Sequence, residues 1–352
     1  MARVLLGMSG GVDSTISAIL LKEQGHEVIG LTMRLWSQND DVANIKLPKQ
    51  IIEAKEAANT IGIKHVVVDI RQEFYDKIIS YFKNEYLAGK TPNPCAKCNT
   101  ILKWEVLNRE AIKYNCSFIS TGHYVNTLQL GKYKYITKGL DPEKEQSFFL
   151  WGLTQEIISK AIFPLGKISK LKVREIATKN NLIKLEKKKE STGICFLENN
   201  YQPFLTSLLK KENIQIPKGF FTNEKGEKLG EHSGYPNYTV GQRRGLGLVL
   251  KEPMYVKQII PSKNEIVLGN RDSLYKNEML LRDYNFVNIK DIEKEVITKI
   301  RYRKQAALSR LKIIDSNYLH VEFIEPEWSI APGQTAAFYD GNRLLGGGFI
   351  YQ

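Results

Sequence analysis

The stretches Arg3-Val4-Leu5-Leu6 and Ser9-Gly10-Gly11-Val12-Asp13-Ser14 decide the fold of this 352-residue chain. The first is an apolar run that predicts a buried strand, and the second is a glycine-rich turn. Apolar residues then recur at helical spacing, so a helix is expected to begin at Asp13 and Ser14. Glycines let backbone N–H groups approach an anion closely, and a helix N-terminus offers unpaired donors. The two stretches therefore predict a cradle for the phosphates of a nucleotide.

Two other phosphate-binding patterns do not match this loop. No lysine precedes Ser14, which excludes G-x-x-x-x-G-K-[ST], and the glycine spacing is not that of G-x-G-x-x-G. A tight strand-to-helix turn without a ligand is the alternative interpretation. We favour the phosphate site, because this set of serine, glycine and aspartate residues serves no purpose in a plain connection.

The first half of the chain alternates strand and helix patterns. Strands are expected at residues 4–7, 27–33, 65–70 and 117–121, and helices at 14–24, 49–60 and 73–87. Such alternation predicts an α/β fold with a doubly wound parallel sheet. Ligands bind beyond the carboxyl ends of the strands in such sheets, where residues 7–14, Met33 and Gly122 are expected to converge.

The second half changes in character. A hairpin is expected at residues 124–137, and two helices at 155–161 and 169–180. Residues 200–260 are rich in glycine, tyrosine and proline, and from about 265 short alternating strands predict a small antiparallel barrel or sandwich. We therefore expect three domains, at residues 1–198, 199–264 and 265–352.

The composition favours a polyanionic partner. The chain has 51 Lys and Arg against 38 Asp and Glu, a formal net charge of +13. RNA or DNA would use this excess, because neutralised phosphates release counterions; charges scattered over solvated faces are the alternative, and composition leaves both open. No apolar run reaches about 18 residues and the chain starts directly with a strand. We therefore expect neither a membrane span nor a signal peptide. Four cysteines in 352 residues do not make a disulfide scaffold, so a cytoplasmic, reducing setting is expected.

Three of the four cysteines lie in loops framed by glycine or proline. Cys95 and Cys98 stand in residues 90–99, where two prolines are expected to prevent regular structure ahead of a helix near Asn99. A thiol at a helix N-terminus beside Lys97 and Lys103 is expected to have a lowered pKa. Cys195 follows the lysine-rich run 184–189, a setting that also favours thiolate.

The three thiols allow three interpretations. They are incidental; or they hold a metal, as an iron–sulfur cluster with one open iron or as zinc; or one carries a persulfide that another resolves through a disulfide bond. Cys116 starts an apolar strand and is interpreted as ordinary packing.

A resemblance covers the whole length of the chain. The segments that carry it are, in order, residues 7–14, 93–94 with 98–99, 121–124, 146–150, 191–196, 238–247 and 331–334. With these segments the chain resembles the bacterial tRNA-specific 2-thiouridylase family of PP-loop ATP pyrophosphatases. The resemblance implies an N-terminal adenine nucleotide alpha hydrolase-like domain, a small central domain that contacts tRNA and a C-terminal β-barrel.

The resemblance also implies site residues. ATP, with Mg²⁺, would bind to Gly7, Met8, Ser9, Gly10, Gly11, Val12, Asp13, Ser14, Met33 and Gly122. Cys98 would be the nucleophile and Cys195 the persulfide carrier. The tRNA would contact Asn93, Pro94, Cys95, His123, Lys144, Glu145, Gln146, Arg301, Tyr302 and Gln334.

The implied reaction is the 2-thiolation of the wobble uridine of tRNA. ATP would adenylate the C2 oxygen, and sulfur from Cys195 would replace it, leaving a Cys98–Cys195 disulfide. A cysteine desulfurase or relay protein would supply the sulfur. An RNA-independent PP-loop synthetase is the first rival, and an RNA-binding or iron–sulfur regulatory protein with a degenerate nucleotide site is the second.

The chain departs from the family pattern at Cys95. Better-known members carry aspartate there, and often Lys-Asp-Gln in place of Lys144-Glu145-Gln146. The second change keeps the carboxylate. The first removes a possible acid–base group and creates C-x-x-C, so thiolation assisted by an iron–sulfur cluster on Cys95, Cys98 and Cys195 stays open beside the persulfide route.

Overall fold

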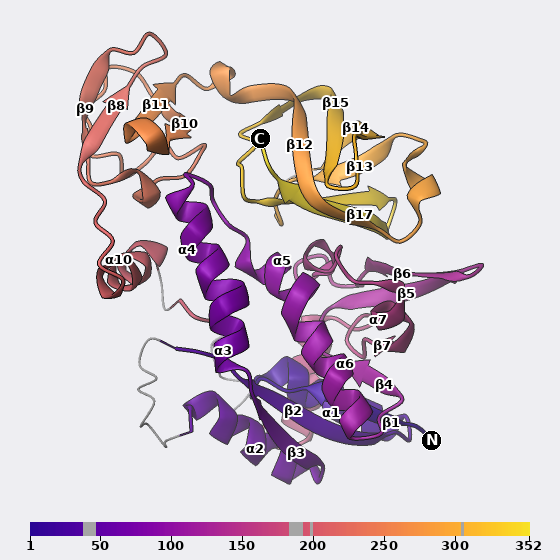
Figure 1. Cartoon of the computed structure of the whole chain (residues 1–352). Coiled ribbons are helices and arrows are strands. Elements are labelled where there is room, and N and C mark those ends of the chain that lie inside the picture. The colour runs from indigo at the N-terminus through magenta and orange to yellow at the C-terminus, as the bar shows by residue number, and fades with distance from the viewer. Residues whose placement is uncertain (38–46, 183–192, 198–199, 304–305) are drawn as a thin grey trace. The chain divides into compact units, whose positions relative to one another are not determined.

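A five-stranded sheet organises the N-terminal half (Figure 1). The computed structural model describes residues 1–37, 47–182, 193–197, 200–303 and 306–352. The sheet order is β3-β2-β1-β4-β7, and every neighbouring pair is parallel. Its strands are β1 (Arg3–Gly7), β2 (Glu27–Arg34), β3 (Lys64–Asp69), β4 (Phe118–Ser120) and β7 (Ala161–Ile162). The predicted parallel α/β sheet is confirmed, and strand order reverses between β1 and β4.

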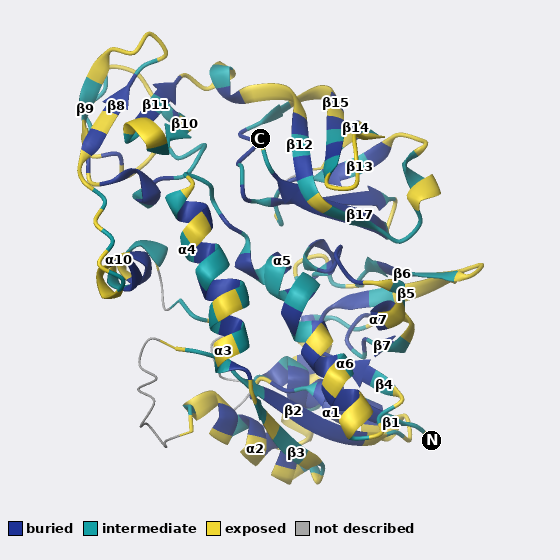
Figure 2. Cartoon of the chain, viewed as in Figure 1, coloured by how far each residue is buried: buried dark blue, intermediate teal, exposed yellow. Residues whose placement is uncertain are grey.

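Helices cover both faces of this sheet. Helices α1 (Val12–Glu23) and α2 (Lys49–Ile61) share one core cluster with Val4 and Leu6 of β1. Side chains alternate along a strand, so Leu5 points to the opposite face, where α6 (Trp104–Lys113) contacts β1 and β4. Figure 2 shows β1 and β2 buried along most of their length. Burial on both faces explains the unbroken apolar run of the first strand.

The predicted hairpin and the two helices after it are also present. Strands β5 (Val125–Leu130) and β6 (Tyr133–Lys138) form the antiparallel hairpin. Helix α7 (Gln155–Lys160) follows, and α8 (Lys170–Lys179) packs on α1 through Val173 and Ala177. The contact between α8 and α1 brings the start of α8 beside the predicted phosphate loop.

The segment that holds Cys95 and Cys98 is helical, so the prediction that two prolines prevent regular structure there is wrong. Helix α5 (Pro94–Cys98) runs without a break into the π-helix η2 (Asn99–Lys103) and then into α6. Proline is compatible with the first helical position, where its missing N–H would have no partner anyway. Cys98 therefore lies inside a helical stretch and not at its N-terminus.

A second interrupted helix covers the predicted range 73–87. It consists of α3 (Arg71–Phe74), the π-helix η1 (Tyr75–Ile79) and α4 (Ser80–Leu87). Phe74, Ile78 and Phe82, expected to share one face, are all buried. The π-helical turns in both helical stretches were not predicted.

A small sheet follows helix α10 (Tyr201–Lys211). Its order is β10-β11-β8-β9, with β8 (Gly219–Thr222), β9 (Lys228–His232), β10 (Tyr255–Ile260) and β11 (Glu265–Gly269). Phe221, Val256 and Ile266 form its core with the aromatic rings of Tyr235 and Tyr238.

The chain ends in a closed barrel, so of the two predicted forms the barrel is confirmed. Its order is β12-β15-β14-β13-β16-β17, and β12 pairs with β17 to close it. The strands are β12 (Tyr275–Phe286), β13 (Val296–Lys299), β14 (Ala307–Ile313), β15 (Tyr318–Trp328), β16 (Thr335–Asp340) and β17 (Arg343–Ile350). Short 3₁₀ turns lie at Ser147–Phe149, Tyr235–Asn237, Pro261–Lys263, Asp272–Leu274 and Ile289–Ile292.

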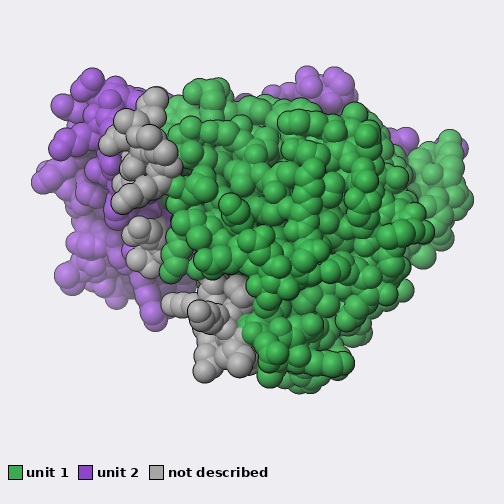
Figure 3. Space-filling model, turned by 90° about the horizontal axis from the view of Figure 1, so that it is seen from below, with its two compact units in different colours: residues 1–78, 95–196, 341–345 green, residues 79–94, 197–340, 346–352 purple. Residues whose placement is uncertain are grey.

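The chain divides into two compact units, coloured separately in Figure 3. Unit 1 comprises Met1–Ile78, Cys95–Phe196 and Gly341–Leu345, and unit 2 comprises Ile79–Pro94, Leu197–Asp340 and Gly346–Gln352. The three predicted domain boundaries stay a prediction. Among the described residues, no helix has the length and apolarity needed to cross a membrane.

Candidate active site

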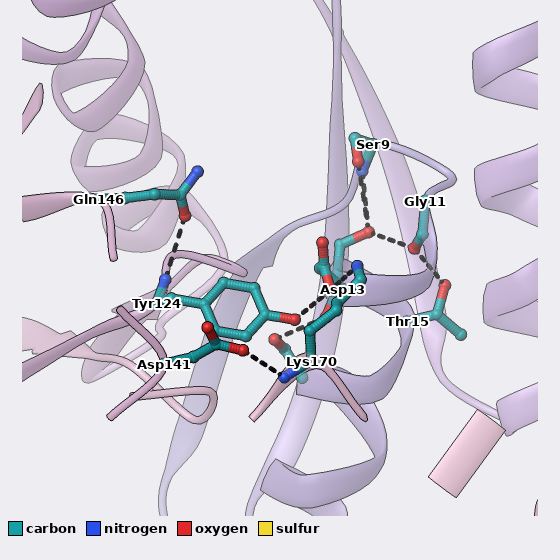
Figure 4. Close-up of polar contacts among 10 residues, drawn as sticks. Ser9, Gly11, Asp13, Thr15, Tyr124, Asp141, Gln146 and Lys170 are labelled. Atoms are coloured by element: carbon teal, nitrogen blue, oxygen red, sulfur yellow. Dashed lines mark hydrogen bonds and ion pairs between the residues drawn. The ribbon is translucent and has the colours of Figure 1, made fainter. Parts of the chain in front are cut away.

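The loop between β1 and α1 is held in shape by its own hydroxyl groups (Figure 4). The Ser14 hydroxyl accepts a hydrogen bond from the Ser9 backbone N–H at 3.2 Å and donates to the Gly11 carbonyl at 3.0 Å. The Thr15 hydroxyl donates to the same carbonyl at 3.0 Å. Ser14 is buried, so its role is to fix the loop from within. The loop is therefore built before any ligand arrives.

The same loop exposes the N-terminus of α1 to an anion. Gly10 has φ +70°, a conformation that favours glycine, and a Cβ there would lie 2.8 Å from the Gln50 carbonyl oxygen. The helix follows at Gly11, and no side chain among the described residues caps it. The first N–H groups of an uncapped helix bind phosphate well. This geometry fits the predicted phosphate cradle.

The loop after β4 closes on the phosphate loop at the point where strand order reverses. A Cβ on Gly122 would lie 3.1 Å from both the Asp13 carbonyl carbon and the Ser14 nitrogen. Met33, near the end of β2, is half-buried at the same sheet edge. Met8 instead packs its side chain against Gly30 of β2, where a Cβ would meet its sulfur. The structure therefore brings most of the predicted ATP residues to one sheet edge, with Met8 beneath it.

Two side chains meet Asp13, and the sequence analysis assigned no role to either of them. The Tyr124 hydroxyl donates to Asp13 Oδ1 at 2.6 Å, and Lys170 Nζ donates to the same oxygen at 2.7 Å (Figure 4). Tyr124 stands in the segment 121–124, which the sequence singled out only as a whole. Lys170 had no signal, because 157 residues separate it from Asp13.

The three thiols of the cysteine segments lie within electrostatic reach of Lys103. The charge on Lys103 affects the pKa of Cys95, Cys98 and Cys195, and the three thiols in turn affect the pKa of Lys103. The segment of Cys195 is anchored by Phe196, whose ring meets the ring of Phe74 edge-on at 5.9 Å. Cys195 itself is exposed, whereas Cys95 and Cys98 are half-buried.

Burial, and not the lysines, dominates the pKa of these thiols. Desolvation raises the pKa of Cys98 to about 11, and the charge of Lys103 opposes it only in part. Desolvation and the two other thiols raise the pKa of Cys195 to about 12, although the residue keeps an exposed surface. The expected lowering of the Cys98 pKa is therefore wrong, since the thiol lies inside a helical stretch where desolvation disfavours the thiolate.

We predict that Cys98 of the free protein reacts slowly with iodoacetamide at neutral pH. A thiol with a raised pKa is protonated below it, so the alkylation rate should rise about tenfold for each pH unit from 7 to 10. Timed alkylation followed by peptide mass spectrometry measures this rate. Lys103→Met is the companion variant, and it should slow alkylation further because the charge that favours thiolate is lost. A rate that reaches its plateau below pH 9 contradicts the prediction.

Comparison with known proteins decides the family. Residues 2–199 match the model of the tRNA methyl transferase HUP domain, residues 204–270 the tRNA methyl transferase PRC-barrel domain, and residues 276–350 the aminomethyltransferase beta-barrel domain. The chain is 42% identical to the tRNA-specific 2-thiouridylase MnmA 2 of Phocaeicola vulgatus, over 99% of this chain and 97% of that protein. It is 41% identical to MnmA of Cytophaga hutchinsonii, over 99% and 97%.

The chain belongs to the tRNA-specific 2-thiouridylase family. The resemblance seen in the sequence is thereby confirmed. The family assignment covers the phosphate loop, both cysteine segments and the barrel, since the three matching models together span nearly the whole chain.

His123 of this 2-thiouridylase follows Gly122 in the loop after β4. Its Nδ1 lies 2.6 Å from the Thr121 hydroxyl, and its ring stacks on Trp104 with 6.0 Å between centroids. Burial and the charge of Lys103 hold the pKa of His123 well below its usual range. The ring is therefore neutral at neutral pH, and its direct neighbours serve to fix its orientation. Its predicted contact with tRNA stays a prediction.

Two of the residues predicted at 144–146 are occupied by internal hydrogen bonds. Glu145 is buried, and its carboxylate accepts from the Ser147 N–H at 2.5 Å. Gln146 Oε1 accepts from the Tyr124 N–H at 3.1 Å. Lys144 is half-buried. The segment is thus held against Tyr124, next to the phosphate loop, and its contact with tRNA stays a prediction.

The remaining predicted tRNA residues lie in unit 2, apart from Cys95 in unit 1. Gln334 Nε2 donates to the carbonyls of Thr91 and Pro92, at 2.9 and 3.2 Å, so it fixes the backbone just before Asn93 and Pro94. Arg301 Nη2 donates to the Ser329 carbonyl at 2.9 Å and hydroxyl at 2.8 Å. Tyr302 is half-buried beside it in the chain. Residues 184–189, 191 and 192 lie outside the described residues.

The described residues do not form a metal cluster site. No group of three or more His, Cys, Asp or Glu in the described ranges is placed to hold a metal ion, and Cys95, Cys98 and Cys195 are within those ranges. Thiolation assisted by an iron–sulfur cluster on Cys95, Cys98 and Cys195 stays a prediction, and the scheme below follows the persulfide route.

Proposed function

We propose that this 2-thiouridylase carries out the ATP-dependent 2-thiolation of the wobble uridine of tRNA. The observation that carries the proposal is the continuity of the site within unit 1. Gly122 touches the phosphate loop, His123 follows it, and Lys103 acts on both His123 and the three thiols. A nucleotide site and a sulfur-transfer site side by side are what adenylation followed by sulfur transfer requires.

Adenylation solves the first chemical problem. The C2 oxygen of uridine is a poor leaving group and must be activated before sulfur can replace it. It attacks the α-phosphorus of ATP and becomes an AMP ester as pyrophosphate departs. The N–H donors at the start of α1 stabilise the charge that develops on the phosphates. Because the loop is preformed, little reorganisation is needed when the charge moves.

Sulfur transfer then replaces the activated oxygen. The terminal sulfur of a Cys195 persulfide bonds to C2, and AMP leaves. The Cys98 thiolate attacks the Cys195 sulfur, which breaks the persulfide S–S bond, leaves one sulfur on the base and forms a Cys98–Cys195 disulfide. A thiol reductant restores both cysteines. The raised pKa of Cys98 means that this attack must follow loss of its proton within the complex.

The exposure of Cys195 suits the loading of sulfur. A cysteine desulfurase or relay protein must reach the carrier thiol, and Cys195 is exposed while Cys98 is not. We assign the persulfide to Cys195 and the resolving step to Cys98 on this difference. Cys95 takes no step of its own in this scheme.

Asp13 is the carboxylate that would hold Mg²⁺ at the phosphate loop. Magnesium in phosphate sites takes one or two carboxylates and draws its remaining ligands from phosphates and water, so one carboxylate fits. When bound, the ion would neutralise phosphate charge.

Unit 2 supplies exposed cations for an RNA backbone. Arg243 and Arg244 are exposed, and the positive φ of Gly241 (+87°) and Gly245 (+74°) shapes the turn that presents them. RNA is recognised largely through shape, phosphates and splayed bases, and a base must leave its stack to be modified. This surface and the net charge of +13 support tRNA as the substrate.

ATP–pyrophosphate exchange, with and without tRNA, tests the proposal. A 2-thiouridylase should exchange pyrophosphate only when a substrate tRNA is present, and mass spectrometry should find 2-thiouridine at the wobble position once a sulfur donor is added. An RNA-independent PP-loop synthetase would exchange without tRNA. The proposal is overturned if the exchange rate does not depend on tRNA, or if the tRNA contains no 2-thiouridine after incubation with a sulfur donor.

A further inference from the structure

Lys170 is a buried cation directly beside the phosphate loop. Only 7% of the residue is exposed, and lysine is rarely buried unless its charge is paired. Its ammonium lies 2.7 Å from Asp13 Oδ1, in the first turn of α1 (Figure 4). The ammonium is therefore held next to the N–H donors that form the proposed phosphate site.

The Lys170 ammonium is not needed to dock α8. The Ser169 hydroxyl accepts from the Lys172 N–H at 3.2 Å, and Asp141 Oδ2 accepts from the Lys170 N–H at 2.8 Å, so the start of the helix is already capped. Val173 and Ala177 pack against α1 in a buried cluster. Backbone caps and apolar contacts hold the helix, and the charged end of Lys170 adds its ion pair with Asp13 and lies 5.9 Å from the centroid of the Tyr124 ring.

Asp13 does not need Lys170 either. Its carboxylate lies at a helix N-terminus, where a negative charge is favourable, and the Tyr124 hydroxyl already donates to Oδ1 at 2.6 Å. The Asp13 side chain is 35% exposed while that of Lys170 is 8% exposed. The Asp13 side of the ion pair is thus accessible to solvent, whereas the Lys170 side is buried.

We propose that Lys170 binds the phosphates of ATP and is the cation that the phosphate loop lacks in its own sequence. This inference rests on the proposed function, since it adds a binding residue to the same ATP site. Lysine binds phosphate as a point charge, and the phosphate loop supplies N–H donors but no cationic side chain of its own. Helix α8 delivers that cation from the other side of the loop, with Asp13 as its resting partner.

Nucleotide binding without tRNA tests this role. We would measure the Kd of ATP by calorimetry, and that of adenosine by ligand-observed NMR, for the wild type, Lys170→Met, Lys170→Arg and the control Lys172→Met. Lys172 is on the same helix but exposed and paired with Glu175. Lys170→Met should raise the Kd of ATP about tenfold or more and leave that of adenosine within about twofold. Lys170→Arg should recover most of the ATP affinity, and Lys172→Met should change neither.

Other outcomes separate the alternatives. Equal losses for ATP and adenosine, or no loss for ATP, overturn the inference, because Lys170 would then only shape the loop. In an Asp13→Asn background the effect of Lys170→Met on ATP should persist; its disappearance would mean that the lysine only orients Asp13. If Lys170→Met does not fold, the Kd values of ATP and adenosine are compared for Lys170→Gln instead. If the wild-type protein does not bind ATP, the proposed function itself is wrong.

Discussion

Replacing either Cys98 or Cys195 with serine is expected to abolish tRNA thiolation. A serine hydroxyl neither carries a persulfide nor attacks one, so each variant should lose roughly 10⁴-fold or more of the turnover. Formation of 2-thiouridine, followed by mass spectrometry of digested tRNA, measures the loss. The affinity for tRNA should stay within about twofold, because a sulfur-to-oxygen change leaves the shape and charge of the surface almost unaltered.

Cys116→Ser is the matched control for both cysteine variants. Its sulfur lies 3.8 Å from the Tyr114 carbonyl, and neither Cys98 nor Cys195 is among the causes that shift its pKa. The control should keep wild-type turnover. Activity retained in Cys98→Ser or Cys195→Ser would sink the assignment of that residue. A single turnover of the wild type should also leave a Cys98–Cys195 disulfide in a non-reducing peptide map.

Replacing Gly10 with alanine is expected to lower ATP turnover about 100-fold or more. The new Cβ would lie 2.8 Å from the Gln50 carbonyl oxygen, and φ +70° is unfavourable for alanine, so the loop must shift. A displacement of about 1 Å at a group that positions a substrate is enough for a loss of this size. Assays of ATP–pyrophosphate exchange in the presence of tRNA measure the effect.

Gly25→Ala separates displacement of the loop from backbone strain. Gly25 follows α1 at its far end with φ +82°, and a Cβ there meets nothing within 4 Å. Its variant therefore carries similar strain, about 1 kcal/mol in the free energy of unfolding, without moving the phosphate loop. Exchange should stay near the wild-type rate in Gly25→Ala. Equal losses in the two variants would mean that strain, and not the loop geometry, limits activity.

The sequence predicted the features that depend on local pattern. Burial of β1 on both faces requires the apolar run at Val4, Leu5 and Leu6, and the loop that follows needs glycine at position 10 for its backbone alone. Both requirements are visible in neighbouring residues. The parallel sheet, the phosphate loop and the closed barrel could therefore be predicted before any coordinates.

Features set by distant parts of the chain could not be predicted. Lys170 meets Asp13 only because α8 packs on α1, and no local pattern around position 170 announces it. The pKa of Cys98 depends on how deeply the helical stretch is buried, which the neighbouring lysines do not reveal. Pro94 misled the prediction, since proline ends helices in most positions but starts one here.

The π-helical turn η2 fixes which side chains share a face with the nucleophile. In an α-helix each residue advances about 100°, so a residue five positions on points roughly 140° away. A π-helical turn bonds residue i to i+5 and is wider than an α-helical turn, so it brings Lys103 nearer to the face of Cys98, in keeping with the effect of the Lys103 charge on the pKa of Cys98. The π-helical turn thus holds one residue more between its hydrogen-bonded partners than an α-helical turn does. Deleting one residue from 99 to 102 would restore α-helical winding and leave the lysine four positions after Cys98, still on the same face. Without the wide turn and without a deletion, Lys103 would point roughly 140° away from Cys98.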